Sequence, residues 1–243
     1  MARQDIFQEI TGFKDFNVSG QSFRVPIRYR KLDMFFAVYT ADRLKVLAAL
    51  PSPRLKPIPV WPGRVLVALN AFNYLDTDVG AYGEFSVGFP CTCSHQGRTR
   101  FGVYVHRLPV TTEVARVAGI EVWGYPKFIA EMQFEDHPES RGLRMTAAGK
   151  HVLDLRVGKG GFGWDQKITL ATFTVKDGQI VCTKITSRAM LRARPWGQAW
   201  LRTGPHEMGE ELFGLGLSAG PIAVGDFLDI NLLLPEGERL GAV

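Results

Sequence analysis

Short apolar runs of strand length dominate the pattern of hydrophobic and polar positions along the chain. Turn-forming residues separate many of these runs, as is typical of a protein built from strands. The last two runs flank Lys176-Asp177-Gly178-Gln179, which predicts a hairpin because an Asp-Gly pair tolerates the positive φ angles of a tight turn. The runs are Phe35–Tyr39, Arg64–Leu69, Phe101–His106, Ile168–Val175 and Ile180–Thr186.

Two stretches have a helical pattern. The first begins at Ala41 and ends before Pro51, and the second covers Thr111–Val117, with Thr111 or Thr112 as the expected N-cap. The five prolines between Pro51 and Pro62 predict a stiff loop. Because the strands are joined by hairpins rather than alternating with helices, the sequence predicts a mainly β (α+β) fold. We expect a single domain over residues 1–243, with antiparallel sheets and a few short helices.

Composition fits an ordinary globular protein, with 46% hydrophobic and 22% charged residues. The apolar runs fall far short of the roughly 20 residues that cross a bilayer, and the N-terminus leads into no signal-like stretch. The three cysteines are too few and too unevenly spaced for a disulfide framework. These features predict a soluble, cytoplasmic protein with reduced thiols and no membrane partner.

The net charge of +5 favours anionic partners. One option is a small carboxylate, and another is nucleic acid, for which the best candidate is a stretch of arginines interleaved with tryptophans. No nucleic-acid-binding motif accompanies that stretch, so we interpret it as a solvated face and expect no nucleic-acid partner. Its residues are Arg188, Arg192, Arg194, Trp196, Trp200 and Arg202.

Two motifs suggest a cofactor or a metal. Gly158–Gly163 matches the G-x-G-x-x-G dinucleotide pattern, but the residues after it have the pattern of a strand rather than a helix, so we interpret it as a strand connection. Cys91, Cys93 and His95 have the spacing of ligands on one strand face, yet no second ligand pair completes a zinc site. We therefore expect neither a metal nor a cofactor.

Lys127 is the lone lysine of an apolar run from Val122 to Ala130. It either extends its charge to the surface from a buried stem, or lies in a dry pocket where chemistry requires a neutral amine. A free lysine has a pKa of about 10.4, so little of it is nucleophilic near neutral pH. Desolvation favours the neutral amine, which attacks a ketone and gives an iminium that promotes cleavage of nearby carbon–carbon bonds.

The segment Gly119–Lys127 resembles the active-site strand of the acetoacetate decarboxylase-like family, with its G-x-E-x-x-x-Y-P-K pattern. Upstream, Asn70–Thr77 followed by Gly80–Glu84 is similar to that family's segment ending in Y-x-E. The similarity extends from about Phe23 to Pro235. It implies a β-barrel (double-cone) core, no cofactor and assembly into a homo-oligomer.

The resemblance also implies roles for single residues. Lys127 falls on the Schiff-base lysine and Glu84 on a catalytic pocket carboxylate, whereas Asn70 replaces a second family carboxylate. Tyr82 is the tyrosine of the Y-x-E motif and is expected at the substrate. Arg28, or alternatively Arg30, is the candidate for binding the substrate carboxylate.

One departure concerns the reaction. Decarboxylases of the family carry a second lysine directly after the nucleophile, and this chain has Phe128 there. In an extended chain the side chains of Lys127 and Phe128 point to opposite faces, so desolvation alone can activate the amine. We therefore expect a Schiff-base lyase acting on a small keto acid, either a β-keto acid decarboxylase or an aldolase/dehydratase for pyruvate-like substrates. The alternative is a non-catalytic protein that binds a small molecule on the same scaffold.

Overall fold

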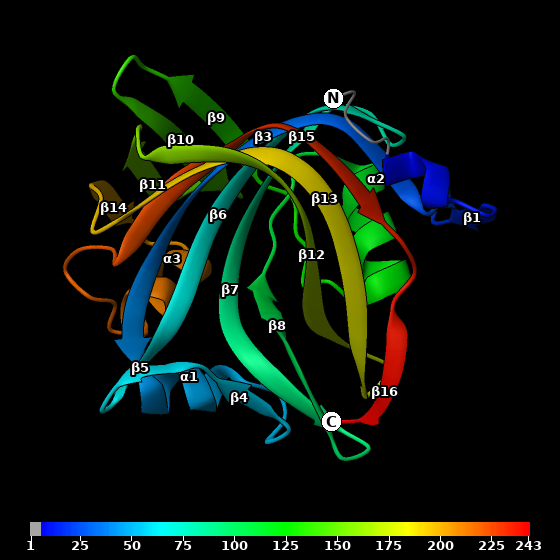
Figure 1. The fold of residues 1–243 in the computed structure, drawn as a ribbon, viewed down its shortest axis with the longest axis horizontal. Coiled ribbons are helices and arrows are strands. Elements are labelled where there is room, and N and C mark those ends of the chain that lie inside the picture. Colours follow the sequence, from blue (N-terminus) through cyan, green and yellow to red (C-terminus); the bar gives the residue numbers. More distant parts are fainter. Residues whose placement is uncertain (1–5) are drawn as a thin grey trace.

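A barrel of seven strands forms the centre of the computed structural model, which describes residues 6–243 (Figure 1). The strands pair in a ring in which β6 and β7 close the circle. Every pair is antiparallel except β8 and β12, which run parallel at Val103–Thr172 and Tyr104–Phe173. The ring order is β7 (Tyr82–His95), β8 (Arg98–Arg107), β12 (Phe162–Lys176), β13 (Gln179–Pro195), β15 (Ala223–Leu234), β3 (Ile27–Asp42) and β6 (Arg64–Thr77).

A second sheet of four strands packs on the outside of the barrel, at the upper left in Figure 1. Its order is β14 (Ala199–Thr203), β11 (Lys150–Gly158), β10 (Ser140–Ala147) and β9 (Glu131–Asp136). Successive side chains of a strand point to opposite faces, so β6 serves both sides of the barrel wall. Val65, Val67, Leu69 and Ala71 join the core against the second sheet, whereas Ala68, Asn70, Phe72 and Tyr74 face the barrel interior.

Shorter strands and helices complete the fold. Strands β1 (Lys14–Val18) and β2 (Gln21–Val25) form a hairpin, and β4 (Leu55–Pro57), β5 (Pro59–Trp61) and β16 (Glu238–Ala242) extend the large sheet. The α-helices are α1 (Arg43–Ala49), α2 (Glu113–Ala118) and α3 (Glu207–Gly214). The remaining helical turns are the 3₁₀ turn η1 (Ile6–Glu9) and the π-helical turn η2 (Gly119–Trp123).

The predicted mainly β fold with a few short helices is confirmed, and each predicted strand lies within a longer one. The predicted hairpin joins β12 to β13, and Asp177 and Gly178 have φ angles of 51° and 68°. Thr112 is the N-cap of α2, as expected. The prediction for 51–62 was wrong in part, because β4 and β5 form there. Prolines are tolerated in these strands because β4 and β5 lie at the edges of the sheet.

The structure assigns other roles to the motifs that suggested a cofactor, a metal or nucleic acid. Gly158–Gly163 runs from β11 into β12, so no helix follows it. Cys91 and Cys93 are buried free thiols, and within residues 6–243 no cluster of His, Cys, Asp or Glu has the arrangement of a metal site. Three of the arginines pair with carboxylates: Arg188 with Asp165, Arg192 with Asp226, and Arg202 with Asp154. Across the described chain, no helix is long and apolar enough to cross a membrane.

Candidate active site

Lys127 lies in an irregular segment after α2, and not in the strand that the family resemblance implied. Helix α2 runs into the π turn η2, where Tyr125 N–H donates to the carbonyl of Gly119 at 3.0 Å. Gly124 then ends the helical turns with a φ of 67°, in the left-handed region that favours glycine. A π turn widens the helix by one residue and is often found at functional sites. Here it turns the chain so that Lys127 points into the barrel.

Val110 connects the lysine segment to the barrel wall. Its N–H donates to the carbonyl of Phe128 at 2.9 Å, and its carbonyl accepts from Ala130 N–H at 2.9 Å. Val110 also forms an antiparallel bridge with Glu84 on β7. One residue is therefore bonded to both segments, which is how Lys127 and Glu84, far apart in the sequence, come together.

Gly119 leaves room for the lysine side chain. A Cβ atom at this position would lie 2.5 Å from Cδ and from Cε of Lys127, and 3.1 Å from its Nζ. The φ angle is not the reason for glycine here, because position 119 is helical. The first glycine of the G-x-E-x-x-x-Y-P-K pattern is thus explained by close packing against the lysine.

Lys127 and Glu84 form a buried ion pair. Lys127 Nζ donates to Glu84 Oε2 at 2.8 Å, and the two side chains are only 6% and 8% exposed. The hydroxyl of Tyr74 donates to the other carboxylate oxygen, Oε1, at 2.9 Å. Because each carboxylate oxygen has a partner, the geometry of Glu84 is fixed from both sides.

Further tyrosines surround the ion pair. Lys127 Nζ lies 5.7 Å from the ring centroid of Tyr82 and 5.8 Å from that of Tyr125, within range of cation–π attraction. The hydroxyls of Tyr82 and Tyr29 are 3.1 Å apart, and that of Tyr125 lies 2.9 Å from Thr172 Oγ1. Burial raises the pKa of all four tyrosines, Tyr74 included, and the nearby Glu84 charge raises each further. At neutral pH these groups are uncharged hydroxyls that can donate hydrogen bonds.

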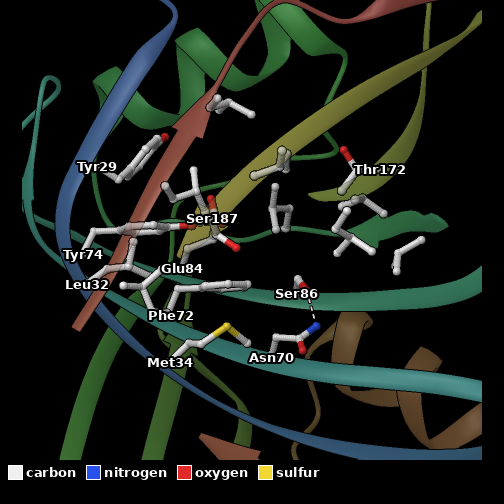
Figure 2. Close-up of a pocket in the computed structure, with 18 of the residues that line it drawn as sticks. Tyr29, Leu32, Met34, Asn70, Phe72, Tyr74, Glu84, Ser86, Thr172 and Ser187 are labelled. Carbon is white, nitrogen blue, oxygen red and sulfur yellow. Dashed lines mark hydrogen bonds between the residues drawn. The ribbon is translucent and has the colours of Figure 1, made fainter. Parts of the chain in front are cut away.

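The ion pair opens into a cavity of about 300 Å³ inside the barrel. Such a volume suits a small organic molecule. Figure 2 shows Glu84 among the side chains that line this cavity. Most of its wall is apolar, and most of the polar side chains that line it are hydrogen-bonded to one another. The polar lining residues are Tyr29, Asn70, Tyr74, Tyr82, Glu84, Ser86, Tyr125, Lys127, Thr172 and Ser187, and the apolar ones include Leu32, Met34, Phe72, Val103, Val105, Leu108, Ile168, Ile185, Phe227 and Leu232.

Four of the residues predicted for the site line this cavity, namely Lys127, Glu84, Tyr82 and Asn70. Arg28 does not. Its guanidinium binds Asp78, with Nε to Oδ2 at 2.9 Å, and Arg30 pairs with Asp76 and Asp78. Arginine strongly prefers such carboxylate partners, and Asp78 follows β6 at the end of the barrel. Among the described residues that line the cavity, Lys127 is the one cationic side chain.

Phe128 lies outside the cavity. Its ring stacks on His206 with centroids 5.7 Å apart and packs against the core between barrel and second sheet. The expectation that positions 127 and 128 face different sides therefore agrees with this structure, although the backbone between them is not a strand.

Tyr74, Ser86 and Gly119 were not predicted as site residues from the sequence. A signal for Tyr74 was present, since residues four apart in a strand share a face, and Asn70 was already a candidate. No local pattern points to Ser86, because its place depends on the register between β6 and β7.

The structure resembles several solved proteins at low sequence identity. Acetoacetate decarboxylase from Legionella pneumophila subsp. pneumophila str. Philadelphia 1 aligns with a TM-score of 0.71 at 18% identity, covering 89% of this chain and 88% of that one. The enduracididine biosynthesis enzyme MppR, solved with pyruvate, aligns with a TM-score of 0.66 at 17% identity, covering 89% and 91%. An acetoacetate decarboxylase-like enzyme from Sphingomonas wittichii RW1 gives 0.62 at 18% identity, covering 93% and 97%. At these identities the likeness shows a shared fold.

The sequence itself provides the family assignment. No curated protein matches the chain. The family model for acetoacetate decarboxylase matches residues 17–190, a span that contains both Glu84 and Lys127. The chain therefore belongs to the acetoacetate decarboxylase family.

Proposed function

We propose that this protein is a cofactor-free Schiff-base lyase in which Lys127 attacks the carbonyl carbon of a small keto acid. The observation that carries the proposal is the buried Lys127–Glu84 pair, 2.8 Å between Nζ and Oε2, at the wall of a 300 Å³ cavity. A buried lysine with one partner and an adjoining empty volume has the geometry that a nucleophilic amine requires.

Glu84 is proposed to move the protons. The ammonium of Lys127 transfers a proton to Glu84 Oε2, and the free amine adds to the ketone to give a carbinolamine. The proton returned by Glu84 leaves with the carbinolamine oxygen as water, and a cationic iminium remains. That cation lies where the ammonium was, so the carboxylate stabilises both charged states.

The iminium then accepts an electron pair from a bond that breaks one carbon away. In a β-keto acid, the bond to the carboxylate breaks, CO₂ leaves and an enamine forms. In an aldol product, the carbon–carbon bond breaks and an aldehyde leaves after its hydroxyl loses a proton. Protonation of the enamine and hydrolysis of the iminium release the product and restore Lys127.

Family membership supports both reactions. Acetoacetate decarboxylase and an enzyme solved with pyruvate are both among its structural relatives. The departing carboxylate would meet no arginine among the described residues of the cavity wall, because Arg28 and Arg30 are bound to Asp76 and Asp78. An apolar wall destabilises a carboxylate more than CO₂, which favours decarboxylation in such a site.

The second candidate is a binding protein that holds a carbonyl compound without turnover. It is favoured by one observation, the absence of a second cation beside Lys127 in the described part of the lining. Such a protein would bind the ligand without a covalent bond to Lys127.

Exchange of the ketone oxygen with water distinguishes the Schiff-base lyase from the binding protein. An iminium forms and hydrolyses with loss of the original oxygen, so wild-type protein in H₂¹⁸O should label a ketone, and Lys127→Ala should not. Labelling no faster than the uncatalysed rate in both proteins would contradict the proposal. Assembly into a homo-oligomer and a cytoplasmic location are further proposals, which light scattering and cell fractionation would test.

A further inference from the structure

We propose that Asn70 and Ser86 form a second recognition point in the cavity, which binds a neutral hydrogen-bonding group at the far end of the substrate. The inference rests on the proposed function, because the position of Asn70 and Ser86 is given as a distance from the carbonyl that Lys127 attacks. It deepens that function by naming a substrate class, a keto acid whose non-acidic end carries a hydroxyl, carbonyl or amide group.

The β6–β7 ladder supplies the spacing. Phe72 is paired with Glu84, and the next inward-facing pair along the ladder is Asn70 with Ser86. Two residues of an antiparallel strand advance by about 7 Å. Lys127 Nζ contacts Glu84, so the reacting carbonyl lies at the Glu84 level and Asn70–Ser86 lies about 7 Å from it along the strands. Figure 2 shows Asn70 and Ser86 directed toward each other, apart from the Glu84 and Tyr74 group.

The pair retains unused hydrogen-bonding capacity. Asn70 Nδ2 donates to Ser86 Oγ at 2.9 Å, and within residues 6–243 neither side chain has another hydrogen-bond partner. The Ser86 hydroxyl hydrogen, the second amide hydrogen and the Asn70 carbonyl oxygen are therefore available. Both residues line the cavity, so these groups face the space that a ligand would fill.

The surroundings favour a neutral group over an acid. Phe36 pairs with Asn70 across the strands, and Met34 and Phe72 line the same region. Apolar side chains therefore surround the Asn70–Ser86 pair. Lys127, the one cation of the described lining, is already paired with Glu84. A ligand carboxylate placed beside Asn70 would be buried without a counter-ion, and burying an unpaired charge is costly.

A span of about 7 Å corresponds to roughly six bonds of an extended carbon chain. The ladder continues beyond Asn70 and Ser86 to Ala68 and Gly88, which carry little or no side chain. The far wall is Val103, which packs so closely on Gly88 that a Cβ there would lie 2.5 Å from Val103 Cγ1. The distal polar group of the substrate would therefore bind near this end of the cavity. The part of the substrate between this group and the reacting carbonyl would be apolar.

The test uses two ketones of matched length, 7-hydroxyheptan-2-one and octan-2-one. Each is titrated against the protein, the imine is reduced with cyanoborohydride, and the adduct on the Lys127 peptide is quantified by mass. Wild-type protein should reach half-saturation at about tenfold lower concentration of the hydroxyketone, because a buried polar site rejects an analogue that leaves it unpaired. Asn70→Leu and Ser86→Ala should each remove most of this preference.

Asn73→Leu is the matched control, since Asn73 lies on the same strand and faces away from the cavity. It should keep the preference, and thermal unfolding would verify that each variant folds. Equal half-saturation by the two ketones in wild-type protein, or an unchanged preference in Asn70→Leu and Ser86→Ala, would overturn the inference.

Binding of the same pair by calorimetry separates this inference from the proposed function. If no adduct forms but the hydroxyketone binds more tightly and the preference disappears in Asn70→Leu, the Schiff base is refuted and the recognition point stands. If adducts form with no preference, the recognition point is refuted and the Schiff base stands. If neither ketone forms an adduct or binds, both are overturned.

Discussion

Tyr74 donates a hydrogen bond to Glu84 Oε1 at 2.9 Å, the carboxylate oxygen that Lys127 does not contact. The tyrosine thus holds Glu84 in the position from which its other oxygen reaches the lysine. Tyr74 itself is fixed by ring stacking on Tyr82, with centroids 4.4 Å apart. The proton acceptor of the proposed mechanism is therefore positioned by a residue on a neighbouring strand.

Replacing Tyr74 by Phe removes that hydrogen bond and keeps the ring. We expect kcat to fall about tenfold, equivalent to about 1.4 kcal/mol of barrier, with a smaller change in KM. Unfolding in urea should show a loss of about 1.5–3 kcal/mol, the value of a hydrogen bond to a charged group. Tyr104→Phe, in a half-buried tyrosine outside the cavity, is the control and should leave kcat unchanged. Equal kcat in Tyr74→Phe and wild type would contradict the positioning role.

Gly119→Ala introduces a methyl carbon only 2.5 Å from the present positions of Lys127 Cδ and Cε, so the lysine side chain must move. We expect turnover to fall on the order of 100-fold, because displacing a reacting group by about 1 Å costs that much. Stability should change far less, since alanine is favoured over glycine in a helical turn by about 1 kcal/mol. Gly214→Ala, at the end of α3 with open space around it, controls for the substitution. Full activity in Gly119→Ala would show that the close packing has no functional role.

The Lys127–Glu84 pair should show strong energetic coupling. Removing one partner leaves the other charge buried, so Lys127→Met and Glu84→Gln should each destabilise the protein, by up to about 3–5 kcal/mol. The double variant should lose about 1–3 kcal/mol less than the sum of the single losses. Urea unfolding of the four proteins measures this difference. Additive losses would mean that the two charges do not stabilise one another.

The tyrosines give a prediction for alkaline pH. Burial raises the pKa of Tyr39 to about 12, and it also raises the pKa of Tyr29, Tyr74, Tyr82 and Tyr125 above the ordinary value of 10. Tyr104, the last of the six tyrosines, shifts in the same direction for the same reason. Folded protein should therefore show no tyrosinate absorbance step at 295 nm near pH 10.

The stability consequence has a definite sign. In the unfolded chain the phenols ionise near pH 10, whereas in the folded chain they keep their protons to higher pH. The contribution of these groups to stability is complete below pH 10 and is lost as the pH rises above it. Unfolding followed from pH 9 to 12 should show a falling midpoint together with tyrosinate appearing on unfolding. A tyrosinate step near pH 10 in the native protein would contradict the buried environment.

Local pattern predicted a large part of this fold. The Asp177–Gly178 hairpin and the helix that begins after Thr112 follow from backbone preferences of a few residues, so they were visible in the sequence. The irregular conformation at Lys127 was not predicted, because it depends on a π turn that is stabilised by contacts with distant segments. One such contact is Trp123 Nε1–H donating to the carbonyl of Pro235 at 2.7 Å.

The site was partly predictable, for a related reason. Glu84 and Lys127 were paired through the family resemblance, and the structure brings them into contact. Arg28 was placed at the substrate, but Asp78 lies within reach of its guanidinium and holds it outside the cavity. Ser86 and Gly119 could not be assigned, because their roles arise from strand register and from side-chain packing across the fold.

The most direct test of the Schiff-base proposal is borohydride reduction in the presence of a keto acid. Wild-type protein is mixed with pyruvate or acetoacetate and reduced, and intact and peptide masses are compared with those of Lys127→Ala treated in the same way. We predict a stable adduct on the peptide that contains Lys127 and none in the variant. No adduct across a panel of keto acids, or an equal adduct in Lys127→Ala, would contradict a Schiff base at Lys127.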